Sequence, residues 1–272
     1  MDNETIMKFL PNYIAPGMGE DMLIDKIAPF IDTAENWVNS YIVAQRFTDG
    51  NTELQELRNN IIAVRALYLA APALDVTMHP NGLAVVNTDS LAPASAERSK
   101  EFRKTLDKQT LEHIDRFLEH VYNEGQSVKF LSTAPGSSMW GATIFKTCAD
   151  LISYTDTEPT WDHLINSLHH ASALENRIAE KFISYRLLHR FRLWKDNLPQ
   201  PSDFLSVISD LKSVIGKSIA ANVFPDFNDM RPIVERIRKR PDIFPEWHES
   251  STANLFDPPV FKNQKKSGGY FF

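Results

Sequence analysis

The chain has 272 residues with a formal net charge of -6, from 35 acidic and 29 basic side chains, which excludes a global positive excess that would attract nucleic acid nonspecifically. The hydrophobic fraction of 43% and the charged fraction of 24% exclude global disorder. A single cysteine, Cys148, excludes an intramolecular disulfide, and no apolar stretch approaches the roughly 18 residues of a membrane span. The opening residues, Met1 to Thr5, lack the pattern of a secretory signal, so we expect folding in a cytoplasm.

Two helices are predicted in the first quarter of the chain. Apolar residues recur at mostly helical spacing from about Glu20 to Phe47, and Pro29 is expected to kink or divide this helix because proline lacks an amide proton. The second helix is predicted from about Thr52 to Ala71, with Thr52 as its N-cap and Pro72 as its stop.

A short hairpin is predicted near residues 76–86. Asn81 and Gly82 supply the positive φ angles that tight hairpin turns require. A two-stranded ribbon is marginally stable alone, so it is expected to pack on helices or on another chain. Asn81 and Gly82 are therefore candidates for partner contact.

Further helices complete the N-terminal half, which we place at residues 1–154. One is predicted from Pro93–Ser95 towards Asn123, and another from about Met139 to Ser153. The turn-rich residues 155–159 are taken as the boundary between two helical halves.

The second half, residues 160–240, is predicted to hold three helices. One helical rhythm starts at Trp161 and extends to Trp194, with Trp161 and Phe182 on its buried side. Shorter helices are expected over 202–221 and 226–240, and an extended arm over 241–272. The predicted fold is mainly α, a helical bundle body with a short β-hairpin and extended termini.

No pattern typical of catalysis or metal binding emerges. The eight histidines include His163, His169 and His170 on one predicted helix, but none has the carboxylate spacing of a zinc or di-iron motif. Cys148 is interpreted as a buried structural thiol, and the run from Asp226 to Asp229 as a helix cap rather than a calcium loop. Phosphate-binding glycine loops and a nucleophile elbow are absent from the sequence. We therefore predict no cofactor, no metal and no enzymatic activity.

A candidate basic face lies on the last predicted helix. Its members are Arg231, Arg236, Arg238, Lys239 and Arg240. They could contact phosphates or an acidic partner, whereas the alternative interpretation is a solvated or salt-bridged helix surface.

Candidate contact residues also lie in the arm. Three terminal aromatics would be unusual if a free tail exposed them to water, so the arm is predicted to dock, on its own body or on another subunit. The residues expected to contribute are Lys262, Lys265, Lys266, Tyr270, Phe271 and Phe272.

Three stretches carry a resemblance to a known family. Residues 66–87 read ALYLAAPALDVTMHPNGLAVVN, residues 91–98 read LAPASAER, and residues 265–272 read KKSGGYFF. Together they resemble an uncharacterised family encoded by phages and prophages of Bacteroidetes, whose members look like structural proteins of the head and tail module.

The resemblance implies a head-to-tail connector or neck-ring subunit. It further implies a homo-oligomeric ring, contacts with the portal protein and other neck or tail proteins, passing contact with DNA in a channel, and no membrane. The protein would occupy the host cytoplasm during assembly and then the neck of the virion. Two alternatives remain, a non-catalytic bacterial scaffold or binding module and an enzyme with an unrecognised site.

Overall fold

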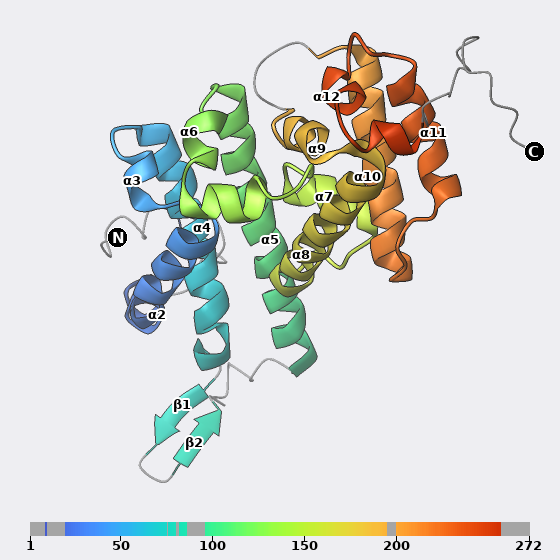
Figure 1. Ribbon diagram of the computed structural model, residues 1–272. Coiled ribbons are helices and arrows are strands. Elements are labelled where there is room, and N and C mark those ends of the chain that lie inside the picture. The colour runs from blue at the N-terminus through green and yellow to red at the C-terminus, as the bar shows by residue number, and fades with distance from the viewer. Residues whose placement is uncertain are drawn as a thin grey trace, which may run out of the picture.

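The computed structural model describes residues 9, 20–74, 76–79, 82–85, 96–194 and 200–256, and side chains within the ranges 25–74, 96–194 and 200–256. Helices dominate these residues, which confirms the predicted mainly α class (Figure 1). Within the described part of the chain, none of the helices combines the length and apolarity needed to cross a membrane.

The N-terminal unit is a three-helix layer built around α4 (Thr52–Leu74). Helix α2 (Glu20–Tyr41), followed by the single turn α3 (Gln45–Thr48), packs on one side of α4, and α5 (Ala96–Asn123) packs on another. The buried residues of α2 recur at helical spacing and are Ile27, Ile31, Ala34 and Val38.

Pro72 and the cap of this unit differ from expectation, and Pro29 does not divide its helix. Pro29 lies inside α2 on an exposed face, and Pro72 lies inside α4 instead of ending it. Near Pro29, water can satisfy the carbonyl that loses its amide donor, so the helix continues. The N-cap of α4 is Asn51 rather than Thr52, because the amide of Leu54 donates to Asn51 Oδ1 at 3.1 Å.

Beyond the end of α4 lie two short strands, β1 (Val76–His79) and β2 (Gly82–Val85), which pair antiparallel with Val76 opposite Val85 and Met78 opposite Leu83. In Figure 1 this ribbon projects past the neighbouring ends of α4 and α5.

The middle of the chain contains the first clear error in the predicted helices. Instead of one helix over 139–153, the chain forms α6 (Ser127–Leu131), a π-helical turn η2 (Gly136–Trp140), a buried irregular loop over 141–147, and α7 (Cys148–Thr155). Gly136 permits the close turn, because a Cβ there would lie 2.0 Å from the carbonyl oxygen of Phe130.

The C-terminal unit starts with α8 (Trp161–Ile178), which continues into a π-helical turn η3 (Ala179–Ile183). The predicted helix over 161–194 breaks at Ser184, whose φ of 71° ends one helical run. The Ser184 hydroxyl then caps α9 (Tyr185–Arg192) by accepting from the amide of Leu187. Trp161 and Phe182 are 5% and 7% exposed, as predicted.

Helices α10 (Ser202–Ala221) and α11 (Phe227–Arg238) follow the prediction closely. Asp226 caps α11 in a reciprocal capping box with Asp229, which confirms the cap interpretation of this run. Gly216 of α10 meets α7 closely, since a Cβ at Gly216 would lie 2.1 Å from the carbonyl oxygen of Tyr154.

The start of the predicted extended arm is instead folded. Residues 241–256 include α12 (Pro245–His248) and the 3-10 turn η4 (Ala253–Leu255), and both Phe244 and Trp247 are fully buried. The Trp247 indole donates to the Phe182 carbonyl at 2.8 Å, and Arg190 donates to the Ile243 carbonyl at 2.6 Å. The burial of these two aromatic rings stabilises the segment against the body of the protein, although only part of the segment is helical. Residues 257–272 lie outside the described part of the chain.

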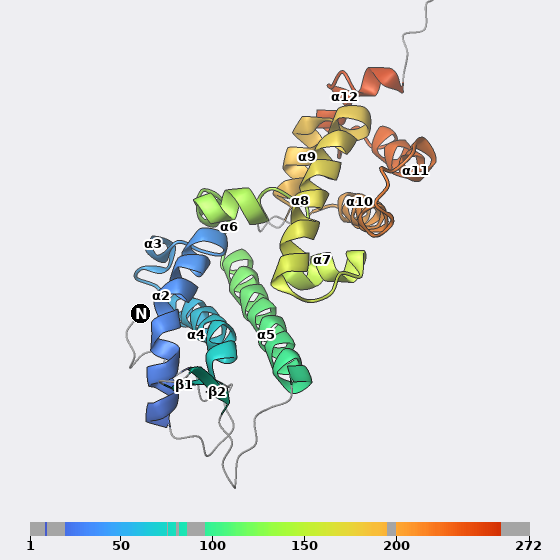
Figure 2. The ribbon, with the colours of Figure 1, turned by 90° about the horizontal axis from the view of Figure 1, so that it is seen from below.

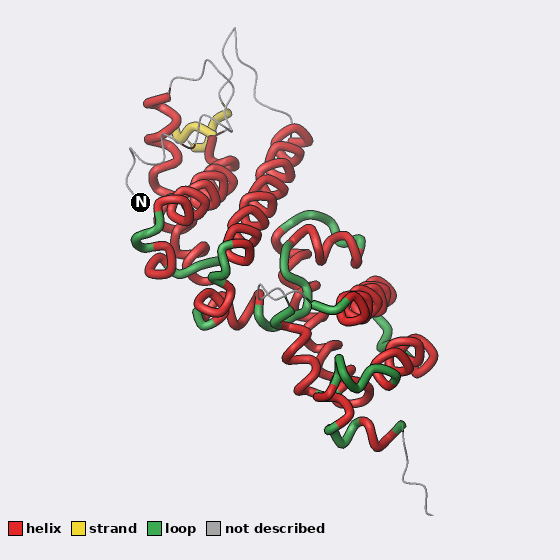
Figure 3. Tube along the Cα trace, turned by 90° about the horizontal axis from the view of Figure 1, so that it is seen from above, coloured by secondary structure: helices red, strands yellow, loops and turns green. Residues whose placement is uncertain are grey.

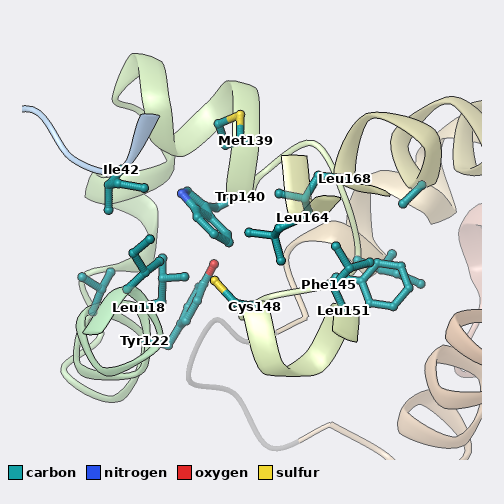
Figure 4. Packing of buried hydrophobic residues seen from close by; sticks show 14 of the residues in the cluster. Ile42, Leu118, Tyr122, Met139, Trp140, Phe145, Cys148, Leu151, Leu164 and Leu168 are labelled. Atoms are coloured by element: carbon teal, nitrogen blue, oxygen red, sulfur yellow. The ribbon is translucent and has the colours of Figure 1, made fainter. Parts of the chain in front are cut away.

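One hydrophobic core joins the two units (Figure 4). Leu118 and Tyr122 of α5, Trp140 of η2 and Cys148 of α7 meet at this junction. Helix α7 precedes the predicted boundary at 155–159, yet it packs on α10 and α8 as well as on α5. Figure 3 shows α2 to α5 on one side and α8 to α11 on the other.

Candidate functional site

The most deeply buried charges surround the irregular loop 141–147. The fully buried carboxylate of Glu175 accepts from the Ile144 amide and from Arg192 Nε, both at 2.9 Å. Burial raises the pKa of Glu175, and the Arg192 guanidinium opposes that rise. Lys146 Nζ donates to the carbonyls of Trp140 and Thr143 at 3.1 and 2.8 Å. These charges satisfy loop backbone that has no helical partner, which is a structural role.

The second side of the same loop is held by Asp150 of α7, Lys212 of α10 and Trp194, which follows α9. Asp150 Oδ2 accepts from the Lys146 amide at 3.1 Å and from Lys212 Nζ at 2.5 Å. The Trp194 indole donates to the Ile144 carbonyl at 3.0 Å. Lys212 Nζ also lies 4.8 Å from the Trp194 ring centroid. The loop is therefore a satisfied polar core element.

Cys148 begins α7 beneath this loop and is fully buried, which confirms the predicted structural thiol. Burial raises the pKa of the Cys148 thiol, and the nearby Asp115 carboxylate raises it further. The Asp115 carboxylate also accepts from the backbone amides of Cys148 and Ala149. A thiol held neutral in this way is a poor nucleophile.

The histidines do not gather into a metal centre within the described ranges. Both His169 and His170 are exposed on α8, and His163 Nδ1 lies 2.7 Å from the Thr160 hydroxyl. Nowhere in the described residues do three His, Cys, Asp or Glu side chains lie close enough together to hold a metal ion.

The candidate basic face on α11 is largely ion-paired. Its carboxylate partners include Glu235 for Arg231 at 2.8 Å, Asp210 for Arg236 at 2.6 Å, and Asp242 for Arg240 at 2.8 Å. The Arg231 hydrogen bond lowers the pKa of Glu235. The geometry favours the salt-bridged alternative, so Arg231, Arg236 and Arg240 present less net positive charge than the sequence implies.

An exposed apolar surface lies where the described chain ends. We define the C-terminal aromatic patch as Val223, Phe227, Leu255 and Phe256. Exposed fractions are 62% for Val223, 53% for Phe227 and 69% for Leu255. The Phe256 ring stacks on Phe227 with centroids 6.1 Å apart and planes at 12°.

The patch is continuous with the core beneath it. The Phe256 ring lies 6.4 Å from the Phe182 ring and 6.1 Å from the Trp247 ring. Phe224 lies beside the patch, and its ring has the Arg177 and Lys181 side chains over it at 4.1 and 5.1 Å. Phe256 therefore connects the exposed ring of Phe227 to the buried rings of Phe182 and Trp247.

The predicted contact residues lie mostly beyond the described chain. Gly82 begins β2, whereas Asn81 and the arm residues Lys262, Lys265, Lys266, Tyr270, Phe271 and Phe272 fall outside it. The sequence reasoning missed the patch. Phe227 lies at helical spacing from Met230, Val234 and Ile237 along α11, so the apolar pattern predicts that it is buried and gives no sign of its exposure.

Comparison with known proteins gives one match. A family of unknown function, DUF6712, matches residues 14–127, which is less than half of the chain. No curated protein matches, and no solved structure matches. The matched range includes α2 to α5 and both strands, so the similarity concerns the N-terminal unit and stops before the C-terminal aromatic patch.

Proposed function

We propose that the protein is a structural subunit of a phage virion, a head-to-tail connector that forms a homo-oligomeric ring below the portal and links capsid to tail. The observation that carries the proposal is the C-terminal aromatic patch, with Phe227 and Leu255 more than half exposed. Contiguous exposed apolar surface on a folded body marks a binding surface.

The β1–β2 ribbon supplies a second, different surface. It lies at the end of the molecule opposite α11 and α12 (Figures 1 and 2). An isolated ribbon gains stability when a neighbour covers it. This favours a role for the hairpin in contact between subunits.

Two unlike surfaces at opposite ends suit ring formation. When one surface of a subunit binds a different surface of the next, the contact is head-to-tail, and it closes into a ring if the rotation allows. A protein that used one self-complementary surface would stop at a dimer. The geometry therefore supports cyclic assembly over a simple dimer.

The phage context comes from the sequence resemblance. It makes the portal protein and other neck or tail proteins the expected partners, with assembly in the host cytoplasm before incorporation into the virion. The ion-paired α11 gives no added support for DNA contact by Arg231, Arg236 or Arg240.

Negative-stain microscopy of the purified protein, alone and with the portal protein encoded beside its gene, tests the proposal. The expected result is closed rings that cap the portal. A protein that stays monomeric in both samples would exclude the connector role. A small soluble oligomer that ignores the portal would instead favour the scaffold alternative.

A further inference from the structure

We propose that the C-terminal aromatic patch of one subunit is the acceptor for residues 257–272 of the next subunit in the ring. This inference rests on the proposed function, because it assigns one of the contacts that a ring requires. The donor aromatics are Tyr270, Phe271 and Phe272.

The acceptor has the chemistry that aromatic side chains select. Phe227 is 53% exposed while it stacks on Phe256, and Leu255 beside it is 69% exposed. Aromatic rings gain from further rings at centroid separations of about 4.5 to 7 Å, beyond the area that they bury. A donor with three adjacent aromatic residues, Tyr270, Phe271 and Phe272, matches this surface.

Charge is complementary along the edge of the patch. Asp226 and Asp229 flank Phe227 and are exposed. The donor segment holds three lysines, Lys262, Lys265 and Lys266, against one acid, Asp257. Opposite charge at the rim of an interface fixes register and speeds encounter more than it adds affinity.

The donor is long enough to reach a neighbour. Residues 257–272 span at most about 55 Å when extended. A sphere with the radius of gyration expected for a compact domain of this chain length has a diameter of about 48 Å. A segment that starts at Phe256 in one patch can therefore cross to the equivalent patch of the adjacent subunit.

The sequence favours this crossing over return to the same patch. A residue that precedes proline is biased towards extended backbone, and two prolines, Pro258 and Pro259, come directly after Asp257. The donor segment begins directly after Phe256, which belongs to the acceptor patch. Every subunit would therefore bind the segment of one neighbour and insert its own segment into the patch of the other neighbour. Such links repeat head-to-tail, as a ring requires.

A mixing experiment with two full-length variants tests the inference. The acceptor variant carries Phe227→Ser and Leu255→Ser, and the donor variant carries Tyr270→Ser, Phe271→Ser and Phe272→Ser. Each alone should lose ring formation, with self-association at least about tenfold weaker. Mixed together, they should form heterodimers by light scattering, because the intact donor of one binds the intact patch of the other.

Val128→Ser provides the matched control, since Val128 is 70% exposed on α6 outside the patch. This variant should assemble as the wild type does. An acceptor variant that forms rings equally well would overturn the inference, as would a mixture that stays monomeric while both variants remain folded by circular dichroism. Wild-type rings alongside either result would leave the connector proposal standing.

Cross-linking between differently tagged chains gives an independent measurement. Leu255→Cys in one chain and Phe271→Cys in the other should form an interchain disulfide, while the buried Cys148 stays unreactive. Cross-links formed only within chains, in doubly substituted protein diluted with wild type, would assign the segment to its own patch and refute the proposed exchange.

Discussion

The irregular loop at 141–147 and the C-terminal aromatic patch are both departures from regular helix packing. They differ in whether other residues of the chain satisfy or cover the groups that the departure leaves open. In the loop, buried backbone groups and charges are matched by Glu175, Lys146 and Asp150. In the patch, Phe227 and Leu255 face solvent without cover from the rest of the described chain. A compensated irregularity holds the fold together, whereas an uncompensated one is a place for a partner.

A large change in stability is expected when Glu175, which supports the loop, is replaced. Glu175→Ala leaves the buried Ile144 amide without its acceptor and Arg192 Nε without its carboxylate, although Arg192 still donates to Asn176 Oδ1, so the free energy of unfolding should fall by about 3 kcal/mol. Urea denaturation measures the change. A loss below about 1 kcal/mol would mean that water replaces the carboxylate and that the loop is less dependent on this charge than its geometry indicates.

A substitution beneath the patch should reduce stability much more than a substitution on its surface. Trp247→Ala removes a fully buried ring and should cost about 3 to 5 kcal/mol, whereas Leu255→Ser should cost about 0.5 kcal/mol or less. Thermal unfolding of the two variants side by side checks this. Equal losses would show that Leu255 belongs to the core of its own subunit.

His113 makes stability depend on pH. Burial lowers the pKa of His113 to about 4, with a smaller contribution from Arg116. Because the unfolded chain binds this proton near pH 6.5 and the folded chain does not, stability is present above pH 6.5 and falls as the pH drops towards 4. After a discount for partial exposure, the loss should be about 2 kcal/mol.

Urea titrations at pH 7 and pH 4.5 test this, with His113→Gln as the comparison. The variant should show a shallower fall between the two pH values, since it removes the titrating ring. Parallel curves for variant and wild type would assign the acid sensitivity to other groups.

The smallest effect is expected at the surface pair on α11. Arg231 and Glu235 are exposed and separated by one helical turn, so solvent screens their attraction, and replacing either by alanine should leave the urea denaturation curve close to that of the wild type. Ring formation should also be unchanged. Loss of rings in Arg231→Ala would restore the predicted basic face as a contact surface.

The sequence predicted the helices whose ends carry local signals. Helix α10 ends at Asn222 in a left-handed conformation, and α11 starts at the Asp226 capping box. A few neighbouring residues are therefore enough to predict both helix ends. Ser184 has no such signal, because its positive φ depends on packing around it. The residues that compensate the loop, such as Glu175 and Lys212, lie far along the chain.

The candidate site shows the same limit. Exposure of Phe227 and Leu255 follows from how η3, α11 and η4 pack together, which periodicity alone does not encode. The segment 241–256 was predicted as an arm from its Pro and Phe content, but Trp247 and Arg190 tie it to the core through contacts more than 50 residues apart in sequence.

The contacts that hold α12 and Phe256 on the C-terminal unit also determine how the protein would respond to a pulling force. A pull applied beyond Phe256 is resisted first by its ring contacts with Phe182 and Trp247, and next by hydrogen bonds to the Phe182 and Ile243 carbonyls. A force on the chain beyond Phe256 therefore acts on the buried core of the C-terminal unit and does not simply detach an exposed end. If subunits are linked through residues 257–272 as proposed, a force on the linked assembly would therefore act on the buried core of each C-terminal unit.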